Sequence, residues 1–95
     1  METNEALKAL SALAQETRLV IFRLLVEERL MGLPVHAIEE KLGLADTALS
    51  SHFKELLTAG LIDKRLENGV VYYSVSYHTM NGLINYITVA PPPSH

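Results

Sequence analysis

The sequence contains no cysteine in its 95 residues. It therefore has no disulfide bond, no thiolate ligand for a metal and no thiol that a redox signal can modify. A signal peptide is also missing, because Met1–Leu10 lacks a basic start followed by an apolar run. The longest apolar segment, Leu19–Leu30, is too short to span a bilayer and is interrupted by charged residues. These absences predict a soluble, cytoplasmic protein with no membrane partner.

Positive charge is scarce as well, with 8 Lys and Arg against 11 Asp and Glu and a formal net charge of −3. This balance is a point against nucleic-acid binding, but binding requires only a local basic surface. Acidic residues dominate Met1–Glu40, whereas His52, Lys54, Lys64 and Arg65 fall in the later segments. Any affinity for DNA should therefore be modest and strongly salt-dependent.

Apolar residues, by contrast, make up 48% of the chain. A chain of this length forms one domain, which we place at residues 1–90, and buries only about 60–65% of its extended surface. The apolar content indicates either a tight core or an obligate dimer, and we favour a dimer through the terminal helices. The proline-rich residues 91–95 cannot continue a helix, so we expect a disordered tail there.

Hydrophobic periodicity predicts helices at residues 4–14 and from about residue 15 to Glu28. Gly32 and Pro34 break this pattern, and a very short strand is expected at residues 33–35. The second helix carries a wide apolar stripe, which is typical of a central helix buried on more than one side.

Residues 35–57 have the pattern of a helix-turn-helix. Gly43 permits the positive φ that ends the first helix, and Asp46 is the candidate N-cap of the second, at residues 46–59. Small polar residues are frequent in this second helix. Its apolar face has helical spacing and consists of Leu49, Phe53, Leu56 and Leu57.

Asn68-Gly69 lies between two runs of β-branched and aromatic residues, which is a strong signal for a type I′ hairpin. Tyr72 and Tyr73 alternate faces, so one should be in the core and the other more exposed. A last apolar stripe predicts a helix at residues 78–89. The order α-α-α-α-β-β-α predicts a mainly α protein with a small β-hairpin, a winged helix-turn-helix.

This order and several local strings resemble the ArsR/SmtB family of dimeric bacterial repressors. The match runs over roughly Glu5–Ile87. The strings that carry it are Leu10–Leu19, Glu40–Ala45, Ala48–Lys54, Ala59–Ile62 and Tyr72–Val75. The resemblance implies that the first and last helices, at residues 4–14 and 78–89, pair across a two-fold axis.

The metal ligands of the family are mostly missing. Family sensors commonly carry Cys-x-Cys before the recognition helix, and the matching positions here are Pro34 and His36. Other members carry a carboxylate and histidine set on the last helix. The matching residues here are Ser76, His78, Thr88 and Pro91. Because zinc requires three or four ligands, we expect no metal site and no cofactor. A weak site formed by His36 and His78 across a dimer stays open.

The helix at residues 46–59 is expected to enter the DNA major groove. Its hydroxyls can bond bases or phosphates, although Ser and Thr near a helix start also act as caps. Its histidine and lysine can bond phosphates or remain solvated. The residues expected to contact DNA are Thr47, Ala48, Ser50, Ser51, His52, Lys54, Lys64, Arg65 and Asn68.

Three further residues are informative. Arg18 matches a family arginine, and either an intramolecular salt bridge or a phosphate contact fits it. Glu67 places an acid at the wing tip where the family often has arginines, so the tip's contact with DNA stays open. Glu39 stands where helix-turn-helix units often have a small residue, so either its side chain extends outward or the two helices tilt apart.

The resemblance implies a homodimeric bacterial transcriptional repressor that binds a palindromic operator. The missing ligands predict that no family-type metal site regulates it. The alternative is a winged-helix protein-interaction module with little specific DNA binding. An enzyme is not expected, because Ser51 and His52 are adjacent on a helix and point in different directions. The inducing signal stays open between a small organic ligand, a protein antagonist and none.

Overall fold

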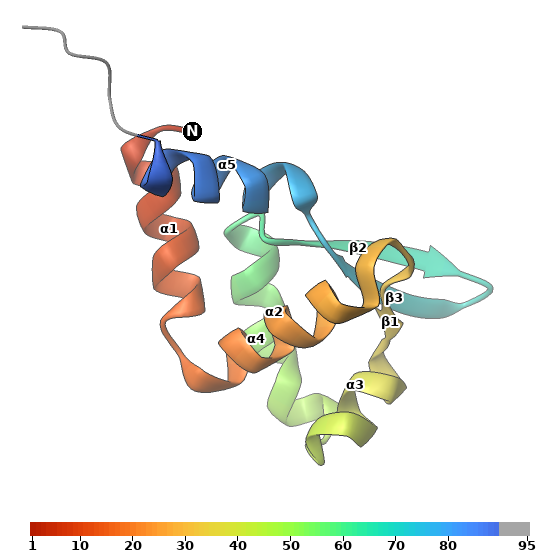
Figure 1. Ribbon diagram of the computed structural model, residues 1–95. Helices are drawn as coiled ribbons and strands as arrows, with labels where there is room; N and C mark the ends of the chain where they lie inside the picture. The colour runs from red at the N-terminus through yellow and green to blue at the C-terminus, as the bar shows by residue number, and fades with distance from the viewer. Residues whose placement is uncertain (90–95) are drawn as a thin grey trace, which may run out of the picture.

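The computed structural model describes residues 1–89, which contain α-helices, one short 3₁₀ helix and one antiparallel sheet (Figure 1). The elements are α1 (Thr3–Leu13), α2 (Glu16–Glu28), η1 (Arg29–Met31), β1 (Leu33–Pro34), α3 (Val35–Leu42), α4 (Asp46–Thr58), β2 (Ile62–Glu67), β3 (Val70–Val75) and α5 (Tyr77–Thr88). This order confirms the mainly α winged helix-turn-helix with its small hairpin. The tail expected at residues 91–95 lies outside the described residues. Within them, every helix is too short or too polar to cross a membrane.

The core forms where α2 crosses α4. Ile21 and Leu25 of α2 are fully buried, as are Leu49 and Leu56 of α4. Burying these large aliphatic side chains supplies most of the favourable free energy of folding in a domain of this size. The helix that carries the candidate DNA-binding residues is therefore fixed by the centre of the protein.

The helix α1 has two apolar faces with different partners. Ala6, Ala9 and Ala12 are buried against the core. Leu7 and Leu10, by contrast, are 61% and 41% exposed. The small alanine side chains let α1 lie close to its neighbours, while the larger leucines remain outside the monomer core.

The helix-turn-helix follows the predicted course with one correction. Gly43 ends α3 with a φ of 67°, as expected. Asp46 is not the N-cap of α4: the cap position is Ala45, whose extended backbone places its carbonyl to accept from the N–H groups of Ala48 and Leu49. Asp46 is instead the first helical residue, where a carboxylate is favoured by the helix dipole.

The sheet has the strand order β1-β3-β2, and both pairings are antiparallel. The expected short strand is β1, whose Leu33 pairs with Tyr73. Asn68 and Gly69 at the hairpin tip both have positive φ, 51° and 76°, as a type I′ turn requires. The hairpin projects away from the helices as a wing (Figure 1).

The wing is joined to the core by an aromatic pair. The rings of Phe53 on α4 and Tyr73 on β3 are stacked, with centroids 4.3 Å apart. Tyr73 is buried and Tyr72 is half-buried, which confirms the predicted alternation. Because Phe53 and Tyr73 are packed face to face, the base of the wing has a fixed position beside α4.

Candidate nucleic-acid interface

The solvent face of α4 carries the predicted contact residues. Helical spacing places the buried residues on one side, so the opposite side of the first two turns faces outward. The residues exposed there are Thr47, Ala48, Ser50, Ser51 and Lys54. Apart from Lys54, their side chains are short, so the backbone at the start of this helix can approach a partner surface closely.

The hydroxyls on this face differ in how they are engaged. The Ser50 Oγ donates to the Thr47 carbonyl at 3.4 Å, a local bond of the kind expected for a serine near a helix start. Within residues 1–89, the hydroxyls of Thr47 and Ser51 make no hydrogen bond. Thr47 and Ser51 are therefore the two hydroxyls best placed to bond a partner.

A groove of about 690 Å³ runs between α3, α4 and the wing. Lys54 from α4 and Lys64 from β2 both line it, so the fold brings together two cations that are ten positions apart in sequence. The groove also receives His36 from α3, a residue that sequence analysis did not place in the DNA-binding surface. Its position was missed because nothing in the local pattern shows that the start of α3 faces the wing.

Two acids share this groove with the lysines. Glu39 is half-buried on α3, and Asp46 lies at the start of α4. With His36 neutral, the two carboxylates balance the two lysines, so the groove has no net charge. Burial raises the pKa of the Tyr73 phenol above its ordinary value, and the negative charge of Asp46 raises it further. Tyr73 therefore lines the groove as a neutral phenol.

His52 is half-buried and faces Arg18 at the start of α2. The Arg18 NH1 lies 3.4 Å from His52 Nδ1, and the Arg18 Nε donates to the Ala12 carbonyl at 2.6 Å. A guanidinium only donates, so this contact requires an unprotonated Nδ1 and leaves the proton of a neutral ring on Nε2. Arg18 thus makes hydrogen bonds rather than an ion pair within residues 1–89, and it joins the end of α1 to α4.

Arg65 of the wing is engaged by neighbours in the wing and in η1. Arg65 Nε lies 2.9 Å from Glu67 Oε2, and the guanidinium carbon lies 4.8 Å from the centroid of the Tyr72 ring. Its NH2 group also donates to the Met31 carbonyl at 3.4 Å. Asn68 is exposed at the tip. Of the predicted wing contacts, Lys64 and Asn68 therefore have no side-chain partner among residues 1–89, and Arg65 is partly neutralised.

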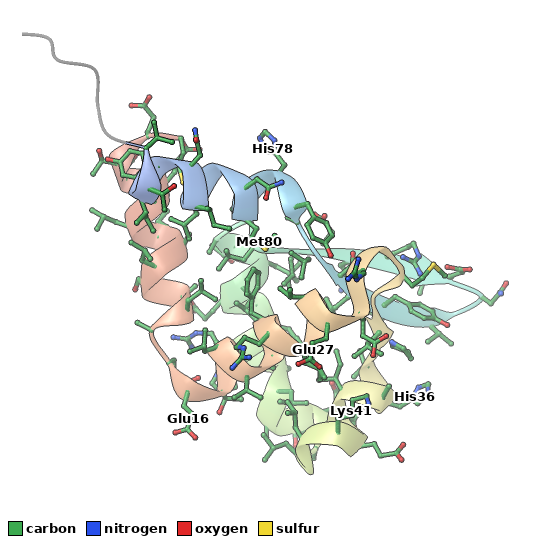
Figure 2. The ribbon with its side chains drawn as sticks, viewed as in Figure 1. Glu16, Glu27, His36, Lys41, His78 and Met80 are labelled. Atoms are coloured by element: carbon green, nitrogen blue, oxygen red, sulfur yellow. The ribbon has the colours of Figure 1, made fainter. Side chains whose placement is uncertain are left out.

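Histidine and carboxylate side chains do not gather in threes anywhere in residues 1–89. His36 on α3 and His78 on α5 lie far apart in the molecule (Figure 2). Any site that uses both would need a second copy of the chain.

Comparisons with known proteins agree with this architecture. No protein-family model matches the chain. The transcriptional activator HlyU of Vibrio cholerae is 34% identical over 86 residues, which cover 88% of this chain and 77% of HlyU. The chain belongs to the ArsR/SmtB family. The ArsR/SmtB relatives found are transcriptional regulators and not enzymes, in agreement with the sequence analysis.

The solved structures extend this ArsR/SmtB assignment to the fold. HlyU from Vibrio cholerae superposes with a TM-score of 0.72 and 32% identity, covering 95% of this chain and all of that one. A homodimeric winged helix-turn-helix DNA-binding domain from Mycobacterium bovis, a possible ArsR-family regulator, has a TM-score of 0.73 and 27% identity; the match covers 90% of this chain and 77% of that one.

A second relative in sequence is the nodulation protein NolR of Rhizobium meliloti, 39% identical over 67 residues. These residues make up 70% of this chain and span 52% of NolR, about half its length.

Proposed function

We propose that this protein is a homodimeric bacterial transcriptional repressor that binds a palindromic operator through α4. The observation that carries the proposal is the exposed, short-chained polar face at the start of α4. A recognition helix must present such a face while its other side is held by a rigid core. Two copies related by a two-fold axis would bind two half-sites about one turn of the DNA helix apart, roughly 34 Å.

In this proposal the start of α4 contacts base edges. Thr47 and Ser51 supply hydroxyls that can donate to or accept from bases, and the Ala48 methyl can contact a thymine methyl. Ser50 is expected to contribute less to DNA binding, because its hydroxyl already donates to the Thr47 carbonyl. His52 is held by Arg18 through Nδ1, so its Nε2–H is the donor available for a phosphate.

The groove between α4 and the wing would hold one sugar-phosphate strand. Lys54 and Lys64 line the groove from different elements, and His36 adds a third donor. Phosphate contacts of this kind position a protein on the duplex without reading its sequence. Glu39 and Asp46 oppose the lysines electrostatically, so we expect modest affinity that falls steeply with salt.

The dimer would form through α1 and α5. Beside Leu7 and Leu10 of α1, the outer side of α5 exposes Ile84 at 51% and Ile87 at 58%. The two helices are joined within one chain by a hydrogen bond between the hydroxyls of Thr3 and Tyr86. Apolar residues on two adjacent helices form the kind of surface that homodimers bury.

Bound at an operator that overlaps the polymerase site, the protein would repress transcription. Because HlyU is named an activator, a reporter assay should measure whether transcription falls or rises. We further propose that no family-type metal site controls the protein. Pro34 supplies no side-chain ligand, and His36 lines the groove beside Lys54. A small molecule or a protein remains the expected inducer, if there is one.

Fluorescence anisotropy with duplexes from its own promoter region tests the proposal. Ser51→Ala and Thr47→Ala should each weaken specific binding by about fivefold, the worth of one hydrogen bond. Thr58→Ala, at the other end of the same helix, is the matched control and should bind as the wild type does. If the wild type shows no salt-sensitive binding, while a pull-down recovers a protein partner, the protein-interaction module is the better description.

A further inference from the structure

A second cleft, of about 390 Å³, lies between α1 and α4, at the C-terminal end of α4 and beyond the candidate DNA-binding residues of its first two turns. Its volume is within the range of pockets that hold small organic ligands. Its lining is mixed, with apolar, hydroxyl and charged side chains: Leu7, Lys8, Ser11, Ala12, Arg18, Glu55, Thr58 and Ala59.

The Arg18 guanidinium in this cleft is half-buried and makes no ion pair within residues 1–89. Of the five N–H donors of an arginine, one bonds the Ala12 carbonyl and one bonds His52. The remaining donors are available to a ligand. A half-buried guanidinium with free donors and no carboxylate partner is suited to a planar carboxylate, which it can bond through two parallel hydrogen bonds.

The other residues that line the cleft restrict the chemistry of the ligand further. Lys8 provides a second cation, and Glu55 is the one acid in the lining, so the cleft carries a net charge of +1. Leu7 and Ala59 form an apolar part of the cleft wall beside these charges. We propose that this cleft is a binding site for a small organic monocarboxylate with an apolar body, held by Arg18 and Lys8.

Such a ligand would act on the hydrogen bonds of Arg18 that join the end of α1 to α4. Arg18 bonds the end of α1 and His52 of α4 with the same guanidinium. A carboxylate that bonds the free donors pulls the guanidinium toward the cleft and away from His52, and so loosens α4 from α1. This consequence rests on the proposed function, and it predicts that the ligand weakens operator binding and that the operator weakens ligand binding by the same factor.

Benzoate is a suitable probe, with benzamide as its uncharged match. In the absence of DNA, titration by NMR should shift the amide signals of Ser11, Ala12 and Ala59 with benzoate and not with benzamide. A Kd on the order of 1 mM is expected for a ligand of this size. Equal binding of the two compounds, or benzoate shifts confined to other regions, would overturn the proposal.

Variants in the cleft sharpen the test. Lys8→Gln should weaken benzoate binding about threefold and Arg18→Gln at least about tenfold, whereas Glu55→Gln should strengthen it by removing a repulsive charge. Lys41→Gln removes the same charge as Lys8→Gln from α3, far from the cleft, and is the matched control (Figure 2). Lys8 and Glu55 are exposed, so their variants test the site even if Arg18→Gln does not fold.

The two proposals fail separately. Benzoate binding without any operator binding would leave the carboxylate site standing and remove the repressor. Operator binding without benzoate binding would leave the repressor standing and remove the carboxylate site. If both occur, benzoate at saturation should weaken operator binding by the wild type, and at the same concentration should have less effect on Lys8→Gln. Unchanged operator affinity would contradict the coupling through Arg18.

Discussion

Arg65 and Glu67 form an ion pair on the wing, with 2.9 Å between Arg65 Nε and Glu67 Oε2. The two residues are next-but-one neighbours on β2, so their side chains emerge on the same face of the strand. Both are well exposed, at 41% and 56% of the side chain, so the pair adds little stability. Its main effect is to neutralise the arginine that lies closest to the wing tip.

Replacing Glu67 with Gln should therefore strengthen DNA binding. The change frees Arg65 for a phosphate, so affinity should rise a few-fold and the slope of log K against log salt should steepen by about 1. Anisotropy titrations at several salt concentrations measure both quantities. Glu16→Gln, on α2, removes the same charge away from the wing (Figure 2) and should have a smaller effect. An unchanged salt slope in Glu67→Gln would show that the wing does not contact DNA.

The lysines of the groove should contribute to DNA affinity without affecting sequence preference. Lys54→Gln and Lys64→Gln should each lower affinity for operator and random duplexes by similar factors and reduce the salt slope by about 1. Glu39→Gln should have the opposite effect, because it removes a carboxylate from the same groove. A lysine variant that weakens only operator binding would place that lysine on a base instead.

The outer residues of α1 and α5 should determine the oligomeric state. Leu10→Glu or Ile87→Glu should turn a dimer into monomers, because a charge would be buried without a partner. Light scattering after size-exclusion chromatography measures the mass. Leu66→Glu introduces the same charge at a leucine of the wing that is 70% exposed, and should leave the mass unchanged. A dimeric Leu10→Glu and Ile87→Glu double variant would exclude this interface.

The stacked pair of Phe53 and Tyr73 should set how firmly the wing is held. Phe53→Leu keeps the site apolar but loses the aromatic contact, and should cost about 1–2 kcal/mol in the free energy of unfolding. Urea denaturation measures this change. A loss below about 0.5 kcal/mol would mean that the two rings are not packed together in solution.

Tyr73 should also make stability fall at alkaline pH. Its pKa in the folded protein is raised, first by burial and then by Asp46, so the folded state holds the phenolic proton more tightly than the unfolded state. This contribution is fully present below the ordinary tyrosine pKa of about 10 and is lost as the pH rises through the folded value. Tyr73→Phe should therefore lose less stability than the wild type above pH 10, with Tyr86→Phe as the control.

Much of the fold follows from local pattern. The Asn68-Gly69 turn, the positive φ of Gly43 and the alternation of Tyr72 and Tyr73 depend on near neighbours in sequence, and all were predicted correctly. The error at Asp46 is also local. The extended backbone of Ala45 begins the helix one residue earlier, with no capping side chain.

The arrangement of the site was harder to predict, because it depends on contacts between distant segments. Arg18 and His52 are 34 positions apart, and no periodicity brings them together. From the sequence, either a salt bridge or a phosphate contact fits Arg18. Its hydrogen bonds to Ala12 and His52 could not be predicted. The entry of His36 into the groove likewise depends on how α3 is placed beside the wing.

The helix α1 has an alanine face and a leucine face, which separates the stability of the monomer from the choice of dimer partner. These two properties often change together. Substitutions at Leu7 or Leu10 alter a surface that the monomer core does not use, because Ala6, Ala9 and Ala12 make the contacts with that core. In the dimer proposed above, partner choice could therefore diverge between duplicated copies of such a gene at little thermodynamic cost to each fold. A cell that carries several such proteins could then keep them from forming mixed pairs by varying the outer side of this helix and the side of α5 next to it.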